Sequence, residues 1–128
     1  MATARRATGD AGEALAARWY ESRGYTVLDR NWRCREGELD LILGTAAMAG
    51  RARQAVVVFC EVKTRRSARF GEPFEAVTAA KQQRIRGLAL RWLAEHSDAR
   101  AAQLRFDVAS VRVDAAGEAA VDVIEAAF

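Results

Sequence analysis

Hydrophobic residues recur with helical spacing near the start of the chain. Leu15 and Trp19 lie four residues apart, which places them on one face of a helix. Thr8 or Asp10 can cap its start, and Gly24 can end it because glycine readily adopts the left-handed conformation. The pattern therefore predicts a first helix that ends just before this glycine.

A second helical pattern occupies the middle of the chain. Thr78 is a suitable N-cap, and the apolar residues after it recur at the i, i+3, i+4, i+7 and i+8 positions of one helix face. These apolar residues are Ile85, Leu88, Ala89, Trp92 and Leu93. We expect this helix to stop near His96 and Ser97.

Shorter segments alternate between apolar and polar residues, as strands do. Three precede the second helix, at residues 25–32, 38–43 and 55–63, and two follow it, at 104–113 and 119–124. The third is apolar on both faces, which is typical of a central strand. The order helix, three strands, helix, two strands predicts an α/β fold with a mixed central sheet flanked by helices, in which a meander is followed by a helical crossover.

Composition limits the class of protein. A chain of 128 residues favours one domain, here 1–128 with a core from about 10 to 125. No apolar stretch suits a membrane span or a signal peptide, so we expect a cytoplasmic protein. Cys34 and Cys60 fit no metal spacing and are expected to be free thiols, and a single histidine argues against zinc.

Charge is unevenly distributed, although the net charge is only +3. Residues 63–91 contain eight basic and two acidic residues, whereas residues 107–128 contain one basic and five acidic residues. A concentrated basic region favours a polyanionic partner, and a solvated charged surface is the plainer interpretation. Lys63 and Lys81 are the only lysines among 20 basic residues, which hints at a chemical need that arginine does not meet.

Charged residues end the most apolar strand. Glu61 and Lys63 lie two residues apart and so point to the same face, and Asp40 is expected on the neighbouring strand. Converging carboxylates repel one another, and a divalent cation relieves that repulsion. The plainer alternative is a structural ion pair between Glu61 and Lys63. The apolar strand before this pair, the acid on the neighbouring strand and the basic residues after it favour the metal site.

Oxygen ligands alone favour Mg²⁺ or Mn²⁺ over zinc. Such an ion can lower the pKa of a bound water and neutralise charge on a phosphate. Lys63 could hold the attacking water or stabilise the developing phosphorane. These parts suffice for hydrolysis of a phosphodiester bond.

Several segments between roughly residues 10 and 93 form a familiar series. They are Gly12-Glu13, Arg30-Asn31-Trp32-Arg33, Gly37-Glu38-Leu39-Asp40-Leu41-Ile42, Val58-Phe59-Cys60-Glu61-Val62-Lys63-Thr64-Arg65, Phe70-Gly71-Glu72-Pro73-Phe74-Glu75-Ala76-Val77 and Lys81-x-x-Arg84-Ile85. In this order they resemble the YraN-like family of bacterial proteins. That family looks like a member of the PD-(D/E)xK nuclease superfamily, near the archaeal Holliday-junction resolvases.

The resemblance implies a restriction-endonuclease-like core with a metal site. Asp40, Glu61 and the backbone carbonyl of Val62 would be metal ligands, and Lys63 would be the catalytic lysine. Glu13 matches a helix-one glutamate that completes such a site, although the helix dipole alone also favours an acid there. A leucine stands before Asp40, where the superfamily name has proline. Nucleases of this shape commonly act as dimers, so a homodimer is expected.

Basic residues near this site are candidates for nucleic-acid contact. Arg65, Arg66 and Arg69 directly follow the predicted strand, in a loop suited to gripping DNA phosphates. Lys81 and Arg84 lie three residues apart near the start of the second helix. Phosphate contact and a solvated charge are equally plausible there.

The sequence thus predicts a metal-dependent nuclease-like protein that hydrolyses phosphodiester bonds in DNA, including branched or structured DNA, with RNA also open. The leading alternative is a non-catalytic nucleic-acid-binding module that keeps the nuclease fold. Acids near a polyanion weaken binding unless a metal offsets them, which counts against that alternative. A third interpretation is a small interaction protein whose basic face docks an acidic partner, and salt-dependent DNA binding would separate it from the other two.

Overall fold

The computed structural model describes residues 2–45, 55–66, 77–96, 99 and 103–128. Within them the elements follow the order helix, three strands, helix, two strands, as predicted. They are α1 (Ala2–Glu21), β1 (Tyr25–Cys34), β2 (Gly37–Thr45), β3 (Val56–Arg66), α2 (Ala79–Glu95), β4 (Gln103–Val113) and β5 (Ala119–Ile124). The α/β fold is confirmed, and it is compatible with a restriction-endonuclease-like core.

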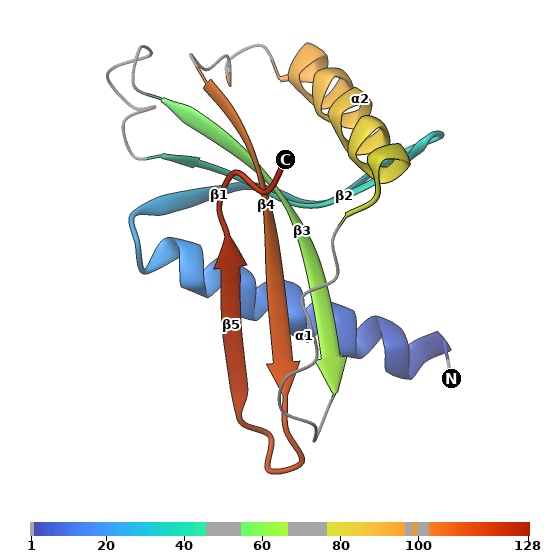
Figure 1. Ribbon diagram of the computed structural model, residues 1–128. Coiled ribbons are helices and arrows are strands. Elements are labelled where there is room, and N and C mark those ends of the chain that lie inside the picture. The colour runs from blue at the N-terminus through green and yellow to red at the C-terminus, as the bar shows by residue number, and fades with distance from the viewer. Residues whose placement is uncertain (1, 46–54, 67–76, 97–98, 100–102) are drawn as a thin grey trace.

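The five strands form one mixed sheet in the order β1-β2-β3-β4-β5 (Figure 1). β1, β2 and β3 are antiparallel neighbours, which is the predicted meander. β3 and β4 are parallel, because the chain crosses over through α2 between them, and β5 returns antiparallel to β4. β3 is therefore the central strand, as its apolar sequence indicates.

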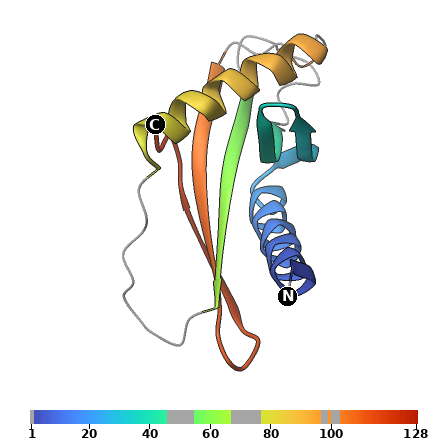
Figure 2. The same cartoon turned by 90° about the vertical axis from the view of Figure 1, so that its right-hand side faces the viewer.

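The two helices lie on opposite faces of this sheet (Figure 2). α1 packs on the face that carries Val58 and Cys60, whereas α2 covers the face that carries Val57 and Phe59. Successive residues of β3 thus point alternately into two apolar clusters, which explains why this strand has no polar face. α2 covers only part of its face, and the β4–β5 hairpin extends beyond it (Figure 1).

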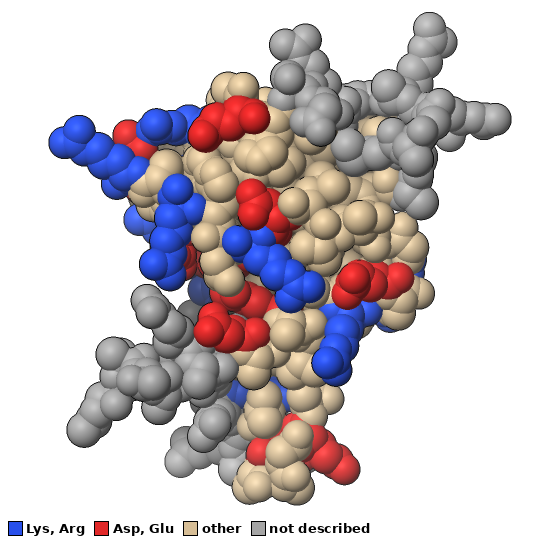
Figure 3. Space-filling view, turned by 180° about the vertical axis from the view of Figure 1, so that it is seen from behind, with Lys and Arg blue, Asp and Glu red and all other residues tan. Residues whose placement is uncertain are grey.

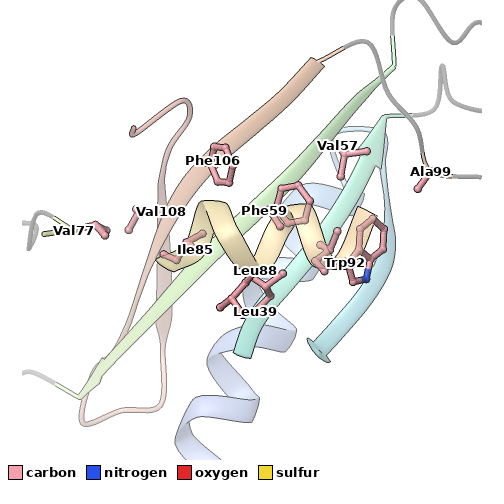
Figure 4. Close-up of a cluster of buried hydrophobic side chains, with 12 residues drawn as sticks. Leu39, Val57, Phe59, Val77, Ile85, Leu88, Trp92, Ala99, Phe106 and Val108 are labelled. Carbon is pink, nitrogen blue, oxygen red and sulfur yellow. The ribbon is translucent and has the colours of Figure 1, made fainter. Parts of the chain in front are cut away.

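The cluster beneath α2 is built around aromatic rings (Figure 4). Phe59 meets Trp92 edge to face with centroids 5.8 Å apart, and it stacks on Phe106 at 5.6 Å. Ile85 and Leu88 complete the buried stripe of the helix. These contacts confirm the core positions that helical spacing predicts for α2.

The helix ends show which capping signals act. The Thr78 hydroxyl accepts a hydrogen bond from the Lys81 backbone N–H at 3.2 Å, so the predicted N-cap of α2 is confirmed. α1 is followed by Gly24 with φ of +88°, as predicted. Its start was predicted wrongly, because the helix begins at Ala2 rather than near Thr8. Alanine and arginine are strong helix formers, and they extend the helix towards the N-terminus.

Neither described helix is long and apolar enough to cross a membrane. Cys34 and Cys60 are both free, as predicted, and Cys60 is buried beneath α1. The sequence predicts a small, polar connection at residues 44–54 and a short helical turn that starts at Pro73. Gly44 and Thr45 belong to β2, and the rest of the connection and the turn at Pro73 lie outside the described residues.

Candidate functional site

The candidate site begins where β2 and β3 stop pairing. Their backbone register runs from Gly44 and Val57 to Leu41 and Cys60. Asp40 and Glu61 are the next residues on the two strands. The two acids predicted as metal ligands therefore come from adjacent positions on neighbouring strands.

The Asp40 side chain continues the link between the strands beyond this point. Its Oδ2 atom accepts a hydrogen bond from the Val62 backbone N–H at 2.9 Å. The Asp40 carboxylate is thereby fixed against the peptide group between Glu61 and Val62. This bond orients the carboxylate without neutralising its charge.

Glu13 reaches the same region because α1 lies unusually close to β3. A Cβ atom added to Gly12 would lie 1.8 Å from Thr64 Oγ1 and 2.8 Å from Thr64 Cβ. No side chain larger than hydrogen fits at that contact. Gly12 thus sets the separation between helix and sheet, and the next residue on the helix is the predicted site glutamate.

Glu13 is a half-buried acid with one buried oxygen that is not satisfied. Its Oε2 atom has no hydrogen-bond partner among the described residues. Burial raises the pKa of Glu13, and a hydrogen bond with the Asn31 side chain partly opposes that rise. A buried oxygen without a partner is costly, which makes it a suitable position for a cation.

Asn31 was given no individual role by the sequence reasoning. It lies on β1 between Arg30, which pairs with Leu41, and Trp32, which pairs with Leu39, so the register places it opposite Asp40. Its φ is +49°, a left-handed conformation that asparagine tolerates better than most residues. Asparagine inside a strand, a type depleted there, was the available signal.

The acids of the site influence one another electrostatically. Burial, followed by the negative charge of Glu61, raises the pKa of Asp40 to about 7, while the hydrogen bond from Val62 opposes the rise. Glu13 and Glu38 raise the pKa of Asp40 further. The structure therefore brings three of the predicted site residues, Glu13, Asp40 and Glu61, into one electrostatic neighbourhood.

Lys81 enters this neighbourhood from α2. Its Nζ atom lies 2.8 Å from Glu61 Oε1, and the exposed fractions of the two side chains are 32% and 15%. The sequence suggested that Lys81 contacts a nucleic-acid backbone or is solvated. Here it forms a half-buried ion pair with a candidate metal ligand.

The other basic candidates are distributed along β3 and α2. Lys63 and Arg65 alternate with Val62 and so share the face of Glu61, where the parallel register places them beside Ser110 and Arg112. The predicted loop start was wrong, since β3 continues to Arg66. A parallel partner strand of equal length accounts for the extension. The Arg66 side chain and all of Arg69 lie outside the described residues, and Arg84 is exposed on α2.

On the face that carries α1, acidic and basic side chains are interspersed (Figure 3). An ion pair joins Arg33 Nε and Glu38 Oε2 at 2.9 Å. Among the side chains that the structure describes, no extended patch of one sign is visible on this side. The α2 side, where Lys63 and Arg65 lie on β3, is thus the better candidate for a polyanion.

The donor set suits a hard cation in its chemistry. Every side-chain donor is a carboxylate oxygen, and one buried oxygen of Glu13 lacks a partner among the described residues. In the same part of the chain, no group of three or more histidine, cysteine or acidic side chains converges to hold a metal ion. The predicted set contains three acids, Glu13, Asp40 and Glu61, beside the Val62 carbonyl, and these three acids do not converge as such a group in the described residues.

Comparison with known proteins gives a consistent family match. The model of an uncharacterised protein family, UPF0102, matches residues 12–111, a range that contains every candidate site residue. A UPF0102 protein of Beutenbergia cavernae is 50% identical over 119 residues, covering 93% of each chain. One of Frankia alni is 48% identical over 125 residues, covering 98% of this chain and 97% of the relative. One of Nocardia farcinica is 49% identical over 124 residues, covering 97% and 91%.

Proposed function

The chain belongs to the uncharacterised protein family UPF0102, and we propose that it is a metal-dependent nuclease that hydrolyses phosphodiester bonds in DNA. The proposal includes the YraN-like and PD-(D/E)xK relationships suggested by the sequence motifs. Mg²⁺ or Mn²⁺ would be the cofactor.

One observation carries the proposal: Asp40 and Glu61 approach each other where β2 and β3 separate, with Glu13 nearby. Clustering buried carboxylates is unfavourable for folding, because burial and mutual repulsion both disfavour the charged forms. Strained electrostatics of this kind are commonly retained at functional sites. A divalent cation would offset the repulsion.

Each residue has a role that follows from its position. Asp40, Glu61 and the Val62 carbonyl would hold the ion, and Glu13 would complete the site. The bound ion would lower the pKa of a water and neutralise phosphate charge. Lys63, on the Glu61 face of β3, would hold the attacking water or stabilise the developing phosphorane.

Nucleic-acid binding would use the basic residues on the α2 side. Arg65 continues the β3 row beyond Lys63, and we propose that it contacts phosphates together with Arg66 and Arg69. Arg84, exposed on α2, would add a further contact. DNA is the proposed substrate, with RNA as a second polymer to test. A homodimer in the cytoplasm is the proposed working form.

A specific observation favours a second function, that of a non-catalytic nucleic-acid-binding module. Lys81 already neutralises Glu61, and no cluster of three potential ligands is present in the part of the chain that the structure describes. In a protein that only binds DNA, the ion pair with Lys81 would be sufficient to neutralise the charge of Glu61, and no metal ion would be needed.

A cleavage assay separates the two functions. Labelled linear, flapped and four-way-junction DNA would be incubated with Mg²⁺ or Mn²⁺ and either wild-type protein or Lys63→Ala. Arg23→Ala, in the turn after α1 at a residue that lies over the Trp19 ring, is the control for loss of one positive charge.

Under the nuclease proposal the wild type and Arg23→Ala cut, whereas Lys63→Ala binds DNA without cutting. If none of the proteins cuts but all bind DNA in a salt-dependent way, the binding module is the better description. Equal loss of binding and cleavage in Lys63→Ala would contradict the assigned role of that lysine.

A further inference from the structure

Lys81 is held in place by the start of α2. Its backbone N–H donates to the Thr78 hydroxyl at 3.2 Å, which fixes the first helical turn. From there the side chain spans to β3, where its Nζ atom lies 2.8 Å from Glu61 Oε1. The ion pair thus connects the first turn of α2 to the acid that ends the apolar part of the central strand.

The position of this ammonium coincides with a need for positive charge. Glu61 is largely buried, and its charge acts on Asp40, which has further acids around it. Lys81 is a cation that the structure places in direct contact with Glu61. It supplies one positive charge where the proposed metal would supply two.

We propose that Lys81 is an internal substitute for the metal ion, and that it must leave Glu61 when a divalent cation binds. This inference rests on the proposed function, because it presumes that Asp40 and Glu61 form a metal site. An ammonium within hydrogen-bond distance of Glu61 Oε1 and a cation ligated by that oxygen compete for the same lone pairs. Binding of the ion therefore includes the loss of the ion pair.

The released lysine has a second partner available. Lys81 is one-third exposed in the first turn of α2, where backbone N–H groups favour anions. A phosphate of the DNA backbone could attract the ammonium and so free Glu61. DNA and metal would then each promote binding of the other, since coupling between two ligands is reciprocal.

Lysine suits this exchange better than arginine does. Eighteen of the 20 basic residues are arginine, yet position 81 carries lysine. A compact ammonium on a flexible stem can move between two oxygen partners, whereas a guanidinium tends to form a fixed, forked pair with one carboxylate. The residue type therefore agrees with a contact that has to be broken.

The test is Mn²⁺ affinity measured by calorimetry on the free protein, without DNA. The variants are Lys81→Gln, which removes the charge, and Lys81→Arg, which keeps it. Arg86→Gln is the matched control, because it removes one charge from the same helix at a residue that lies over Phe106 and Phe128. Asp40→Asn reports whether the measured binding occurs at the proposed site.

We expect Lys81→Gln to bind Mn²⁺ about five- to fiftyfold more tightly than the wild type, which lies within the usual range of coupling between sites. Lys81→Arg should bind Mn²⁺ more weakly than the wild type, because a guanidinium holds Glu61 in a fixed, forked pair. Arg86→Gln should stay within about twofold of the wild type. Adding a phosphorothioate DNA duplex should tighten Mn²⁺ binding to the wild type but not to Lys81→Gln.

Two negative results have different meanings. If Asp40→Asn abolishes Mn²⁺ binding but Lys81→Gln leaves it unchanged, the metal site stands and the substitution role of Lys81 is wrong. If neither wild type nor Lys81→Gln binds Mn²⁺ while circular dichroism shows both folded, the metal site itself is wrong, and the role of Lys81 falls with it.

Discussion

The backbone N–H of Val62 donates a hydrogen bond to Asp40 Oδ2 across 2.9 Å, at the point where β2 and β3 cease to pair. Beyond this point the Asp40 side chain, rather than the backbone of β2, makes the hydrogen bond to β3. The same carboxylate is buried close to the charge of Glu61, and these two effects raise the pKa of Asp40 to about 7. The bond positions an acid in surroundings that disfavour its charge.

The first prediction concerns the pH dependence of folding. The pKa of Asp40 rises from its ordinary value of 3.8 to about 7 on folding, so the folded state holds a proton that the unfolded state releases. The contribution of Asp40 to the free energy of unfolding is fully present below pH 3.8 and is lost as the pH rises to about 7. The asparagine side chain of Asp40→Asn does not titrate. The free energy of unfolding of this variant relative to wild type should therefore increase as the pH rises from 3.8 to about 7 and then level off.

The expected gain is a few kcal/mol at most, since one pKa unit corresponds to about 1.4 kcal/mol. Urea unfolding in EDTA between pH 4 and pH 8 would measure it. Repeating the comparison in a Glu61→Gln background should shrink the effect, because the charge of Glu61 is the second cause of the shift. Wild-type and Asp40→Asn curves that stay parallel across this range would contradict the raised pKa.

The second prediction concerns the contact between α1 and β3. Gly12→Ala would place a methyl group 1.8 Å from Thr64 Oγ1, so helix and sheet must move apart. Overpacking of this kind costs about 1–3 kcal/mol, and here it should also displace Glu13 from Asp40. The midpoint temperature of thermal unfolding and the affinity for Mn²⁺ should therefore both decrease.

Gly87→Ala is the matched control for this substitution. Gly87 also lies within a helix, but a Cβ atom added there meets nothing within 4 Å. Alanine should stabilise α2 by about 0.5–1 kcal/mol through its helix propensity. If Gly12→Ala were as stable as Gly87→Ala, the close approach of α1 would not be a constraint on the site.

Much of the fold could be predicted because its signals are local. The i, i+3, i+4, i+7 stripe of α2 and the doubly apolar β3 are properties of contiguous sequence, and each predicts one element. Thr78 as an N-cap acts on its own helix. Glu61 and Lys63 were placed on one face by strand alternation alone.

Other features depend on how distant elements pack, and local patterns do not contain them. Lys81 and Glu61 meet only because α2 crosses over the end of β3. Alternation along β2 predicts that Leu39 shares a face with Leu41, yet Leu39 packs on the α2 side and Leu41 on the α1 side. The opposing strand β1 has a register shift after Val27 and a left-handed Asn31, and such irregularities change which face a residue meets.

The third prediction concerns a buried acid outside the candidate site. Asp107 is fully buried on β4 and accepts hydrogen bonds from the Tyr20 hydroxyl at 2.7 Å, from Arg105 twice at 2.9 Å, and from the Ala126 backbone N–H at 3.0 Å. All four bonds need acceptor lone pairs, which a carboxylate has and an amide lacks in part.

Asp107→Asn should therefore destabilise the protein by about 3–5 kcal/mol, because it removes the buried charge that Arg105 contacts at 2.9 Å and leaves only the more distant Glu125 beside that guanidinium among the acids the structure pairs with it, at 3.7 Å. Asp122→Asn is the control, since it breaks an exposed ion pair in which Arg112 Nη2 lies 3.0 Å from Asp122 Oδ2. That change should cost about 1 kcal/mol or less. Chemical denaturation of both variants measures the difference, and similar losses would show that the Asp107 network contributes little.

The fourth prediction concerns the binding of phosphates. If Arg65 and Arg66 each contact one phosphate of duplex DNA, each contributes about 0.9 to the slope of log affinity against log salt concentration. Arg65→Ala with Arg66→Ala should then reduce that slope by roughly 2. A control that removes the same charge elsewhere is Arg23→Ala with Arg91→Ala, which changes the end of α1 and the exposed pair between Arg91 and Glu36. Fluorescence anisotropy across a salt series gives both slopes. A slope that changes equally in the two double variants would mean that net charge, rather than a contact at the end of β3, governs DNA binding.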